Sequence, residues 1–535
     1  MRILDTLFNK YPFWLSLIAG VVSATGFAPF HLWPTSLFAL ALWMAIVSSL
    51  GSRKAVFLAG WLFGLGHFIV GLNWIAKAFT FQAAMPEWLG YIAVILLSLF
   101  LAIYPALTAL GSWLLVKGRP IAFVFAFAGF WIVTEWLRSW VFSGFIWNPL
   151  GVILIETPLA LSTRSIGTYG FSAMVIGISG FIGTAISGLL NSQWRIAGRS
   201  VALFIMVGIS AVLLGFVGSG DEISKSGDQP NITVVQPNIG QQDKWQTGYE
   251  NLNLTKLAQL TMPIDNGRID SDEPRILFWP EAAIPDYLET GYPERYYYGR
   301  PPQMVRGQLA SLMQPGDVLV LGALKLEFEE TGAPDERRAI GARNSVFAMD
   351  SNREILGRYD KSHLVPYGEY LPMRPLLSAF GLSRLAPGDF DFWPGPGPQS
   401  LDLGSLGKAG LQVCYEIIFS GQVVNREDRP DFIFNPSNDA WFGSWGPPQH
   451  LAQARLRAVE EGLPIIRSTP TGISAVITSR GKIVDSIPMG QAGRIDTKMP
   501  PPETPTLFAR YGNVLSLGFA LLLILCAIAI RLRTR

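Results

Sequence analysis

The chain has 535 residues, half of them hydrophobic, including 17 tryptophans and 33 phenylalanines. It is too long for one ordinary domain, and such a composition is unusual for a water-soluble protein. The formal net charge of +2 offers no basic surface for nucleic acid, so we expect no nucleic-acid partner.

The hydrophobic residues are concentrated in residues 1–217 and again in 515–530, whereas 218–506 has ordinary soluble composition. A bilayer span takes about 20 apolar residues. This predicts a multi-pass α-helical membrane domain with seven spans (1–217), a polar linker (218–230), a soluble domain (231–506), and a final span with a cytoplasmic tail (507–535). The eight predicted spans are 11–30, 33–50, 55–74, 88–116, 121–141, 166–190, 201–217 and 511–530.

Basic residues between these spans set the expected orientation, because short loops rich in Lys and Arg stay in the cytoplasm. They predict cytoplasmic termini and a soluble domain outside the cytoplasm. A cleaved signal peptide is the alternative for the first span, but no clear small-x-small site precedes Pro29. The basic residues used are Arg2, Lys10, Arg53, Lys54, Lys117, Arg119, Arg195, Arg199, Arg531, Arg533 and Arg535.

Three features of the membrane part need interpretation, and the first two have two readings each. The glycines and aromatics of residues 60–74 favour close helix packing, or alternatively a groove for acyl chains. Glu135 and Arg138, deep in the fifth span, are candidates for function, or they pair with each other at i and i+3. Trp147, in the loop SGFIWNPLG, is expected among lipid headgroups at the outer interface.

The soluble domain alternates strand-like and helical stretches, which predicts an α/β sandwich. The strand-like stretches are 232–236, 276–279, 318–321, 345–349, 411–413, 432–435, 464–468 and 473–477, and the helical ones include 250–260 and 302–312.

Three predicted strands end in groups suited to acyl transfer: Glu281, Lys361 and Cys414. A lone thiol such as Cys414, followed by a predicted helix, is either inert core or a nucleophile. A carboxylate can take its proton, and an ammonium can stabilise the thiolate and then an oxyanion. The combination of the three favours chemistry over three unrelated structural roles.

Several motifs carry a resemblance to known enzymes. WPEAAIP, YDKSHLVPYGEYLP, and VCYE followed by NPSNDAWFG resemble the nitrilase superfamily. Together with the spans, VQPNI and PQHLAQARLRAVE, nearly the whole chain is similar to the bacterial apolipoprotein N-acyltransferase family. The resemblance implies an αββα sandwich outside the cytoplasm.

The resemblance also implies site residues. The Glu-Lys-Cys triad falls on Glu281, Lys361 and Cys414, with Glu369, Tyr415 and Glu416 in support. Candidate substrate-binding residues are Trp147, Trp245, Asn438 and Trp441, with Trp245 near the lipid entrance. Ile146 and Pro470 depart from the family pattern, where proline and asparagine are common, without touching the triad.

The same resemblance implies the reaction and its setting. Cys414 takes an acyl chain from a phospholipid, with phosphatidylethanolamine expected, and passes it to the α-amine of an apolipoprotein's N-terminal diacylglyceryl-cysteine. The protein is expected to be a monomer in the bacterial inner membrane, with a periplasmic catalytic domain and no cofactor. A membrane-tethered amidase, or a scaffold or transporter without catalysis, remains an alternative.

The four histidines show no metal-ligand spacing, so no metal is expected. His363, close to Lys361, is expected to form structural hydrogen bonds. Arg455, Arg457 and Glu460 lie on a predicted helix, where pairing at i and i+3 is the ordinary explanation.

Residues 367–398 form a long segment with apolar side chains and the turn-rich stretch WPGPGP. Long loops in compact domains are commonly lids. We interpret the segment as an arm that dips into the outer leaflet and gates lipid access, with a satellite core as the alternative. Its apolar residues are Leu371, Met373, Leu376, Leu377, Phe380, Leu382, Phe390, Phe392 and Trp393.

Overall fold

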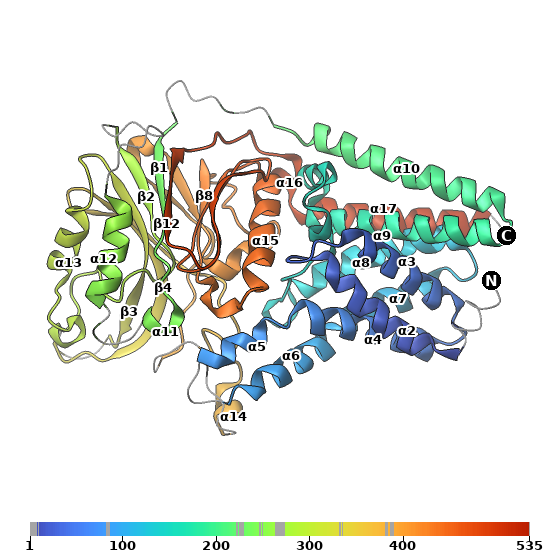
Figure 1. The fold of residues 1–535 in the computed structure, drawn as a ribbon, viewed down its shortest axis with the longest axis horizontal. Helices are drawn as coiled ribbons and strands as arrows, with labels where there is room; N and C mark the ends of the chain where they lie inside the picture. The colour runs from blue at the N-terminus through green and yellow to red at the C-terminus, as the bar shows by residue number, and fades with distance from the viewer. Residues whose placement is uncertain are drawn as a thin grey trace.

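The computed structural model describes residues 8 and 10–533, except 82–85, 221–222, 224–228, 245–247, 249, 263–272, 331–332, 334, 380–383 and 386–389. It has a helical part and a two-sheet part joined end to end (Figure 1). The helix α17 (Asn513–Arg533) ends at the side of the helical part remote from the sheets (Figure 1).

The helical part contains every predicted span as a helix. Six described helical segments are long and apolar enough to cross a membrane, and the first two predicted spans form shorter apolar helices. The predicted span 88–116 is divided at Ala102 into α6 and α7. The helices are α2 (Pro12–Ser23), α3 (Trp33–Ser49), α4 (Arg53–Gly71), α5 (Ile75–Ala78), α6 (Trp88–Leu101), α7 (Ile103–Leu115), α8 (Pro120–Arg138), α9 (Thr163–Leu190), α10 (Trp194–Val217), α16 (Leu507–Tyr511) and α17 (Asn513–Arg533).

Close helix packing explains the glycines of α4. A Cβ on Gly60 would stand 2.6 Å from Ala106 Cα, and one on Gly64 would stand 2.7 Å from Ala102 Cα, both on or beside α7. Distances below 3.0 Å are not tolerated, so these glycines let the two backbones approach. The packing reading of this segment is therefore confirmed for Gly60 and Gly64.

The connection between α8 and α9 folds back into the molecule through three short 3₁₀ segments, η3 (Val141–Ser143), η4 (Leu150–Leu154) and η5 (Pro158–Ser162). The headgroup position expected for Trp147 is wrong, because its side chain is only 1% exposed and packs on Trp74 and Phe442. Inside the protein the indole packs on other rings, and its Nε1–H donates to Gln449 Oε1 at 2.8 Å, so that its polar group needs no headgroup partner.

Two six-stranded sheets form the second part. The first has the order β12-β1-β2-β3-β4-β5 and the second β11-β10-β9-β8-β7-β6. In each, three neighbouring strands are parallel (β1-β2-β3 and β7-β8-β9) and the rest pair antiparallel. The strands are β1 (Asn231–Gln236), β2 (Arg275–Phe278), β3 (Val318–Phe328), β4 (Ala339–Asp350), β5 (Ile355–Asp360), β6 (Ser400–Asp402), β7 (Lys408–Leu411), β8 (Phe432–Pro436), β9 (Ile465–Ser468), β10 (Ser474–Ile477), β11 (Ile483–Ile487) and β12 (Gly493–Lys498).

Helices cover both outer faces of the sheets, so the predicted αββα sandwich is confirmed. The helices α12 (Glu250–Thr261) and α13 (Pro302–Ala310) pack on the first sheet through a core that includes Leu257 and Val305. The helix α15 (Gly446–Glu461) packs on the second sheet and also against α9, between the sheets and the helical part (Figure 1). The short helices α11 (Gln241–Lys244) and α14 (Arg374–Ala379) lie in connecting segments.

Buried polar contacts join the helical part to the sandwich. Arg164 of α9 forms an ion pair with Glu503 at 2.8 Å, and both side chains are almost fully buried. Glu460 of α15, which pairs with Arg457 as expected, also accepts hydrogen bonds from Thr168 N (2.6 Å) and Oγ1 (2.7 Å). These contacts make the helical part and the sandwich one packed unit.

Candidate active site

Cys414 lies where the chain leaves the second sheet after β7. The predicted strand 411–413 is displaced, because β7 ends at Leu411, and the predicted helix after it is only the 3₁₀ turn η8 (Cys414–Ile418). Cys414 has a left-handed φ of 52°, which is costly for a residue with a Cβ. Its side chain is buried between the sheets, at 5% exposure.

Glu281 follows β2 in the first sheet, and its neighbour Ala282 also has a positive φ, of 45°. Its Oε1 accepts a hydrogen bond from Asn344 Nδ2 at 2.7 Å, which fixes the carboxylate. Its Oε2 is buried and has no hydrogen-bond donor among the described residues. One oxygen of this carboxylate is thus held and the other can accept a proton.

Lys361 follows β5, and its ammonium lies 2.9 Å from Glu369 Oε2. Burial alone would lower its pKa, but the charges of Glu369 and Glu281 raise the pKa above its ordinary value. Lys361 therefore stays protonated inside the site.

The pKa of Cys414 is raised well above its ordinary value, first by burial and then by the charge of Glu281. Lys361 and the Asn438 N–H, which faces the sulfur, act in the opposite direction. Cys414 rests as a thiol, so that it needs a base at the moment of attack.

Asn344 links two of the predicted residues and was not foreseen. Its Nδ2 donates to Glu281 Oε1 (2.7 Å) and to Glu369 Oε1 (3.0 Å). No distinct signal in the sequence marks it, because Asn344 stands between two other polar residues of β4, Arg343 and Ser345. It holds the two carboxylates at a fixed separation on either side of one amide.

Glu416 joins the loop that carries Lys361 to the turn that carries Cys414. Its Oε1 accepts from Tyr359 OH, Ser362 N and Ser362 Oγ, each at 2.8 Å, and from His363 N at 3.0 Å. Its Oε2 accepts from Val413 N at 2.7 Å. The carboxylate fixes the lysine and the cysteine relative to each other.

Tyr415 and His363 connect the site to the loop after α8. Tyr415 OH donates to Gly144 O at 2.9 Å, and His363 Nε2 donates to Ser143 O at 2.7 Å. The His363 ring also stacks on Phe419 at 3.8 Å. The structural role expected for His363 is confirmed.

The candidate substrate-binding residues lie in different places relative to the site. Asn438 lies in the site: its Nδ2 donates to Gln241 Oε1 at 2.9 Å, and its buried Oδ1 has no partner among the described residues. Trp441 lies outside, half-buried, with its ring edge on Phe81. Trp147 is buried behind the nucleophile, and Trp245 lies outside the described residues.

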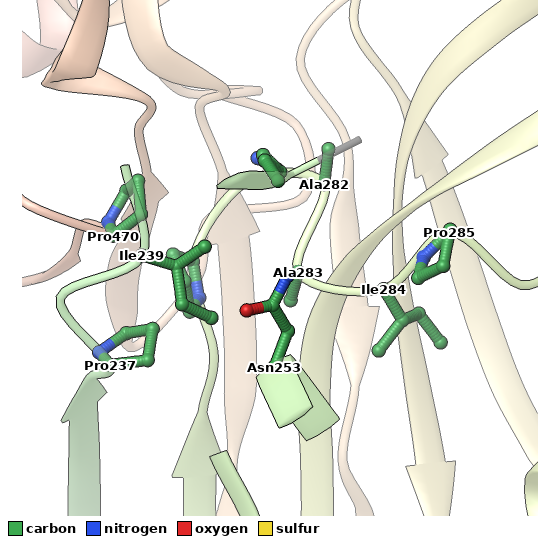
Figure 2. Close-up of a pocket in the computed structure, with 10 residues that line it drawn as sticks. Pro237, Ile239, Asn253, Ala282, Ala283, Ile284, Pro285 and Pro470 are labelled. Atoms are coloured by element: carbon green, nitrogen blue, oxygen red, sulfur yellow. The ribbon is translucent and has the colours of Figure 1, made fainter. Parts of the chain in front are cut away.

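A small cavity lies beside the Glu281 main chain. Pro237, Ile239, Asn253, Ala282, Ala283, Ile284, Pro285 and Pro470 line it (Figure 2), together with Pro280 and Lys244. Lys244 is the one charged residue among the described residues of the lining, and its Nζ donates to Glu281 O at 2.7 Å. Burial lowers the pKa of Lys244 to about 8. Lys244, in the wall of this cavity, thus holds the main chain of Glu281 in place.

A second group that the sequence did not indicate contacts the main chain of Cys414. It consists of His450, Asp439 and Arg467. His450 Nε2 is 3.0 Å from Cys414 O, and Arg467 Nη2 is 2.6 Å from Asp439 Oδ2. No spacing in the sequence could have found them, because β9, α15 and η9 (Asp439–Phe442) are brought together only by the fold. Among the described residues, no group of three or more His, Cys, Asp or Glu side chains could hold a metal ion.

Two family models match the chain: "Apolipoprotein N-acyltransferase N-terminal domain" at residues 19–181 and "Carbon-nitrogen hydrolase" at 231–501. The apolipoprotein N-acyltransferase of Rhodopseudomonas palustris is 34% identical over 97% of this chain and 95% of its own length. That of Bradyrhizobium diazoefficiens is 33% identical over the same shares. Of solved structures, Saccharomyces cerevisiae Nit3, a nitrilase-superfamily member, matches with 18% identity and a TM-score of 0.35, covering 51% of this chain and 91% of that one.

Proposed function

This chain belongs to the apolipoprotein N-acyltransferase family, with a soluble domain of the carbon-nitrogen hydrolase family, and we propose that it transfers an acyl chain in two steps through Cys414. The observation that carries the proposal is the burial of Glu281, Lys361 and Cys414 together between two sheets that stand against a set of apolar helices. The donor is a membrane phospholipid, and the acceptor is the α-amine of an apolipoprotein.

In the first step Glu281 Oε2 takes the proton of Cys414, and the sulfur attacks an ester carbonyl of the phospholipid. The Lys361 ammonium and nearby backbone N–H groups stabilise the oxyanion. When the intermediate collapses, the lysophospholipid oxygen leaves and takes the proton back from Glu281. A thioester on Cys414 remains.

In the second step the neutral α-amine of the apolipoprotein's N-terminal cysteine attacks the thioester. Glu281 takes a proton from the nitrogen and returns it to the departing Cys414 sulfur, so that an amide and free enzyme result. We assign Asn438 Oδ1 as an acceptor for the amine, because it is buried and lacks a donor among the described residues, and the main-chain N–H of the same residue faces the Cys414 sulfur.

The membrane orientation is proposed from the basic residues. Arg119 and Arg531 lie at one end of the helices, where Arg531 Nη1 donates to Leu115 O at 2.7 Å and Arg119 Nη1 donates to Ile530 O at 3.3 Å. This end is remote from the sheets (Figure 1). With the positive end in the cytoplasm, the catalytic domain is periplasmic in a bacterial inner membrane, and both termini are cytoplasmic.

Residues 367–398 are proposed to reach the outer leaflet and gate the site. In α14 and just before it, Met373 is 65% exposed and Leu376 54% exposed, whereas Leu371 is buried. The helix α14 projects from the sandwich on the side where α5 and α6 emerge (Figure 1). Exposed apolar side chains in such a place fit insertion among acyl chains. We also propose that Trp245 and Trp441 contact the lipid.

Mass spectrometry after incubation with phosphatidylethanolamine vesicles tests the proposal on the full chain, with Cys414→Ala as comparison and Cys526→Ser as control. We expect an acyl-sized mass gain on the Cys414 peptide, lost on adding a diacylglyceryl-cysteine peptide that becomes N-acylated. Free fatty acid without N-acylated peptide would indicate a hydrolase, with water as the acceptor in place of the amine. No adduct on folded protein would overturn the mechanism.

A further inference from the structure

The mechanism above leaves unused the buried group behind the nucleophile, His450 with Asp439 and Arg467. Resting on that proposed function, we propose that His450 is a positioning residue that sets the Cys414–Tyr415 peptide for oxyanion binding. Trp147, from the loop after α8, holds the histidine in place, so that the helical part takes part in building the active site.

The contact between His450 and Cys414 fixes the proton on the imidazole. Nε2 lies 3.0 Å from the Cys414 carbonyl oxygen, which can only accept a hydrogen bond, so Nε2 carries the hydrogen. Nδ1 lies 3.0 Å from Arg467 Nη2, which can donate to it, and 3.0 Å from Asp439 Oδ1. The guanidinium is itself held by Asp439, whose oxygens lie 2.6 and 2.7 Å from the same nitrogen.

The groups that face His450 keep it neutral. Burial and the charge of Arg467 lower its pKa, against the smaller effects of Asp439 and the Cys414 carbonyl. Asp439 stays ionised, since the charge of Arg467 beside it lowers its pKa against the effect of burial. The imidazole is therefore a neutral donor at Nε2 and an acceptor at Nδ1, with Arg467 fixing the tautomer.

The direction of the Cys414 carbonyl decides where the next N–H points. The peptide bond between Cys414 and Tyr415 is planar, so its C=O and N–H point in opposite directions. A carbonyl held toward His450 turns the Tyr415 N–H to the opposite side. The left-handed φ of Cys414 is unfavourable, so the turn needs such a partner to hold it.

Trp147 packs on the imidazole ring of His450 and holds it in place. The two rings lie 4.9 Å apart at 35°, and both side chains are buried. Trp147 Nε1 donates to Gln449 Oε1 at 2.8 Å, and Gln449 Nε2 donates to Ala28 O at 3.0 Å, before α3. His450 thus packs on the loop after α8, and its neighbour Gln449 links that loop to the segment before α3.

The loop that carries Trp147 is anchored in turn. Arg138 Nη2 donates to Asn148 O at 3.1 Å, and Asn148 Nδ2 is 3.4 Å from His67 Nε2. Glu135 Oε1, 4.0 Å from Arg138, accepts from Leu150 N at 2.8 Å. Glu135 and Arg138 do more than pair with each other, because both hold the segment that presents Trp147.

Two reactions of the same thiol separate positioning from general damage. Acylation by a phospholipid develops an oxyanion, whereas alkylation by iodoacetamide does not. In a Cys526→Ser background Cys414 is the only thiol. There His450→Phe keeps a ring in contact with Trp147 and removes the Nε2–H that donates to the Cys414 carbonyl. Acyl-enzyme formation should fall roughly 100-fold, as for loss of an oxyanion donor, while alkylation should stay within about threefold.

His450→Gln retains an N–H donor and should recover at least about tenfold of the loss. His31→Gln, at an exposed position, is the control and should behave as the parent protein. Trp147→Phe, which loses the contact with Gln449, should show a smaller fall of the same kind. Thermal unfolding of each variant verifies folding.

Acylation within about threefold of the parent in His450→Phe would overturn the inference, as would an equal fall in acylation and alkylation. Failure of the parent protein itself to form an acyl-enzyme would instead overturn the proposed function. The two failures are thereby distinguished in one experiment.

Discussion

The Lys361 ammonium lies 2.9 Å from the Glu369 carboxylate, and Asn344 Nδ2 lies 3.0 Å from the other oxygen of that carboxylate. The lysine of the site is therefore held by a glutamate outside the triad. Glu369 is the largest contribution that raises the pKa of Lys361 against the effect of burial.

The first prediction follows from this pair. Glu369→Gln removes the anion, so that burial lowers the pKa of Lys361 and the oxyanion loses charge stabilisation. We expect acyl-enzyme formation to fall about 100-fold, measured by mass spectrometry of the Cys414 peptide. Glu354→Gln, at an exposed carboxylate, is the control. An unchanged rate in Glu369→Gln would refute the role of the pair.

The second prediction concerns Glu416, whose two oxygens accept five hydrogen bonds. In Glu416→Gln an NH₂ group would meet an N–H or O–H donor and could not accept from it. A loss of at least about 3 kcal/mol is expected from the unsatisfied donors, together with loss of acylation. Thermal unfolding measures the first effect, and a variant as stable as the parent would contradict it.

The third prediction uses two glycines of long helices. Gly167 in α9 has φ of 66°, and a Cβ there would stand 2.2 Å from the Phe508 ring of α16. Gly167→Ala should lower the unfolding temperature sharply, with a cost of about 2 kcal/mol or more. Gly518→Ala in α17, where nothing lies within 4 Å, should be neutral or slightly stabilising. Equal unfolding temperatures of the two variants would exclude this packing.

The fourth prediction is a pH dependence of stability. Burial raises the pKa of Glu461 from 4.5 to about 7, although Arg429 acts in the opposite direction. The folded state then holds a proton that the unfolded state loses, so this stability is present below about pH 4.5 and is lost as the pH rises through about 7. A shift of this size corresponds to about 3 kcal/mol.

Glu461→Gln removes this loss. The unfolding temperature of the parent, relative to the variant, should therefore fall between about pH 5 and about pH 8. Glu427→Gln, at an exposed position, should leave the pH dependence of the parent unchanged. Parallel curves for the parent and Glu461→Gln would contradict the raised pKa.

The fifth prediction tests the arm. The double substitution Met373→Asp and Leu376→Asp places two charges on the exposed apolar surface of the arm. It should weaken insertion of the arm into a bilayer. Acylation from phospholipid vesicles should fall at least about tenfold, at roughly 1 kcal/mol or more per residue, while iodoacetamide should react as before. Met489→Asp, an exposed residue of the β11–β12 turn, is the control. A loss of both reactions would indicate collapse of the site.

The interior of the fold could be predicted from sequence more completely than its edges. The four edge strands of the two sheets are β5, β6, β11 and β12. The strands β6, β11 and β12 were missed, and β5 was predicted only by its end before Lys361. Edge strands carry polar side chains and show little apolar periodicity, whereas central parallel strands are buried on both faces and read as apolar runs. Every residue of β1, β2 and β9 is buried.

The sequence by itself determined the apolar spans, the central strands, and the positions of Glu281, Lys361 and Cys414 at strand ends, because each depends on neighbouring residues. Only the tertiary structure decided that His450, Asn344 and Arg467 surround these residues and that Trp147 is buried against His450. These contacts join residues 17 to 303 positions apart, counted from His450 to Arg467 and from Trp147 to His450. Local sequence patterns carry no information on such distances, because the packing of sheets and helices against one another sets them.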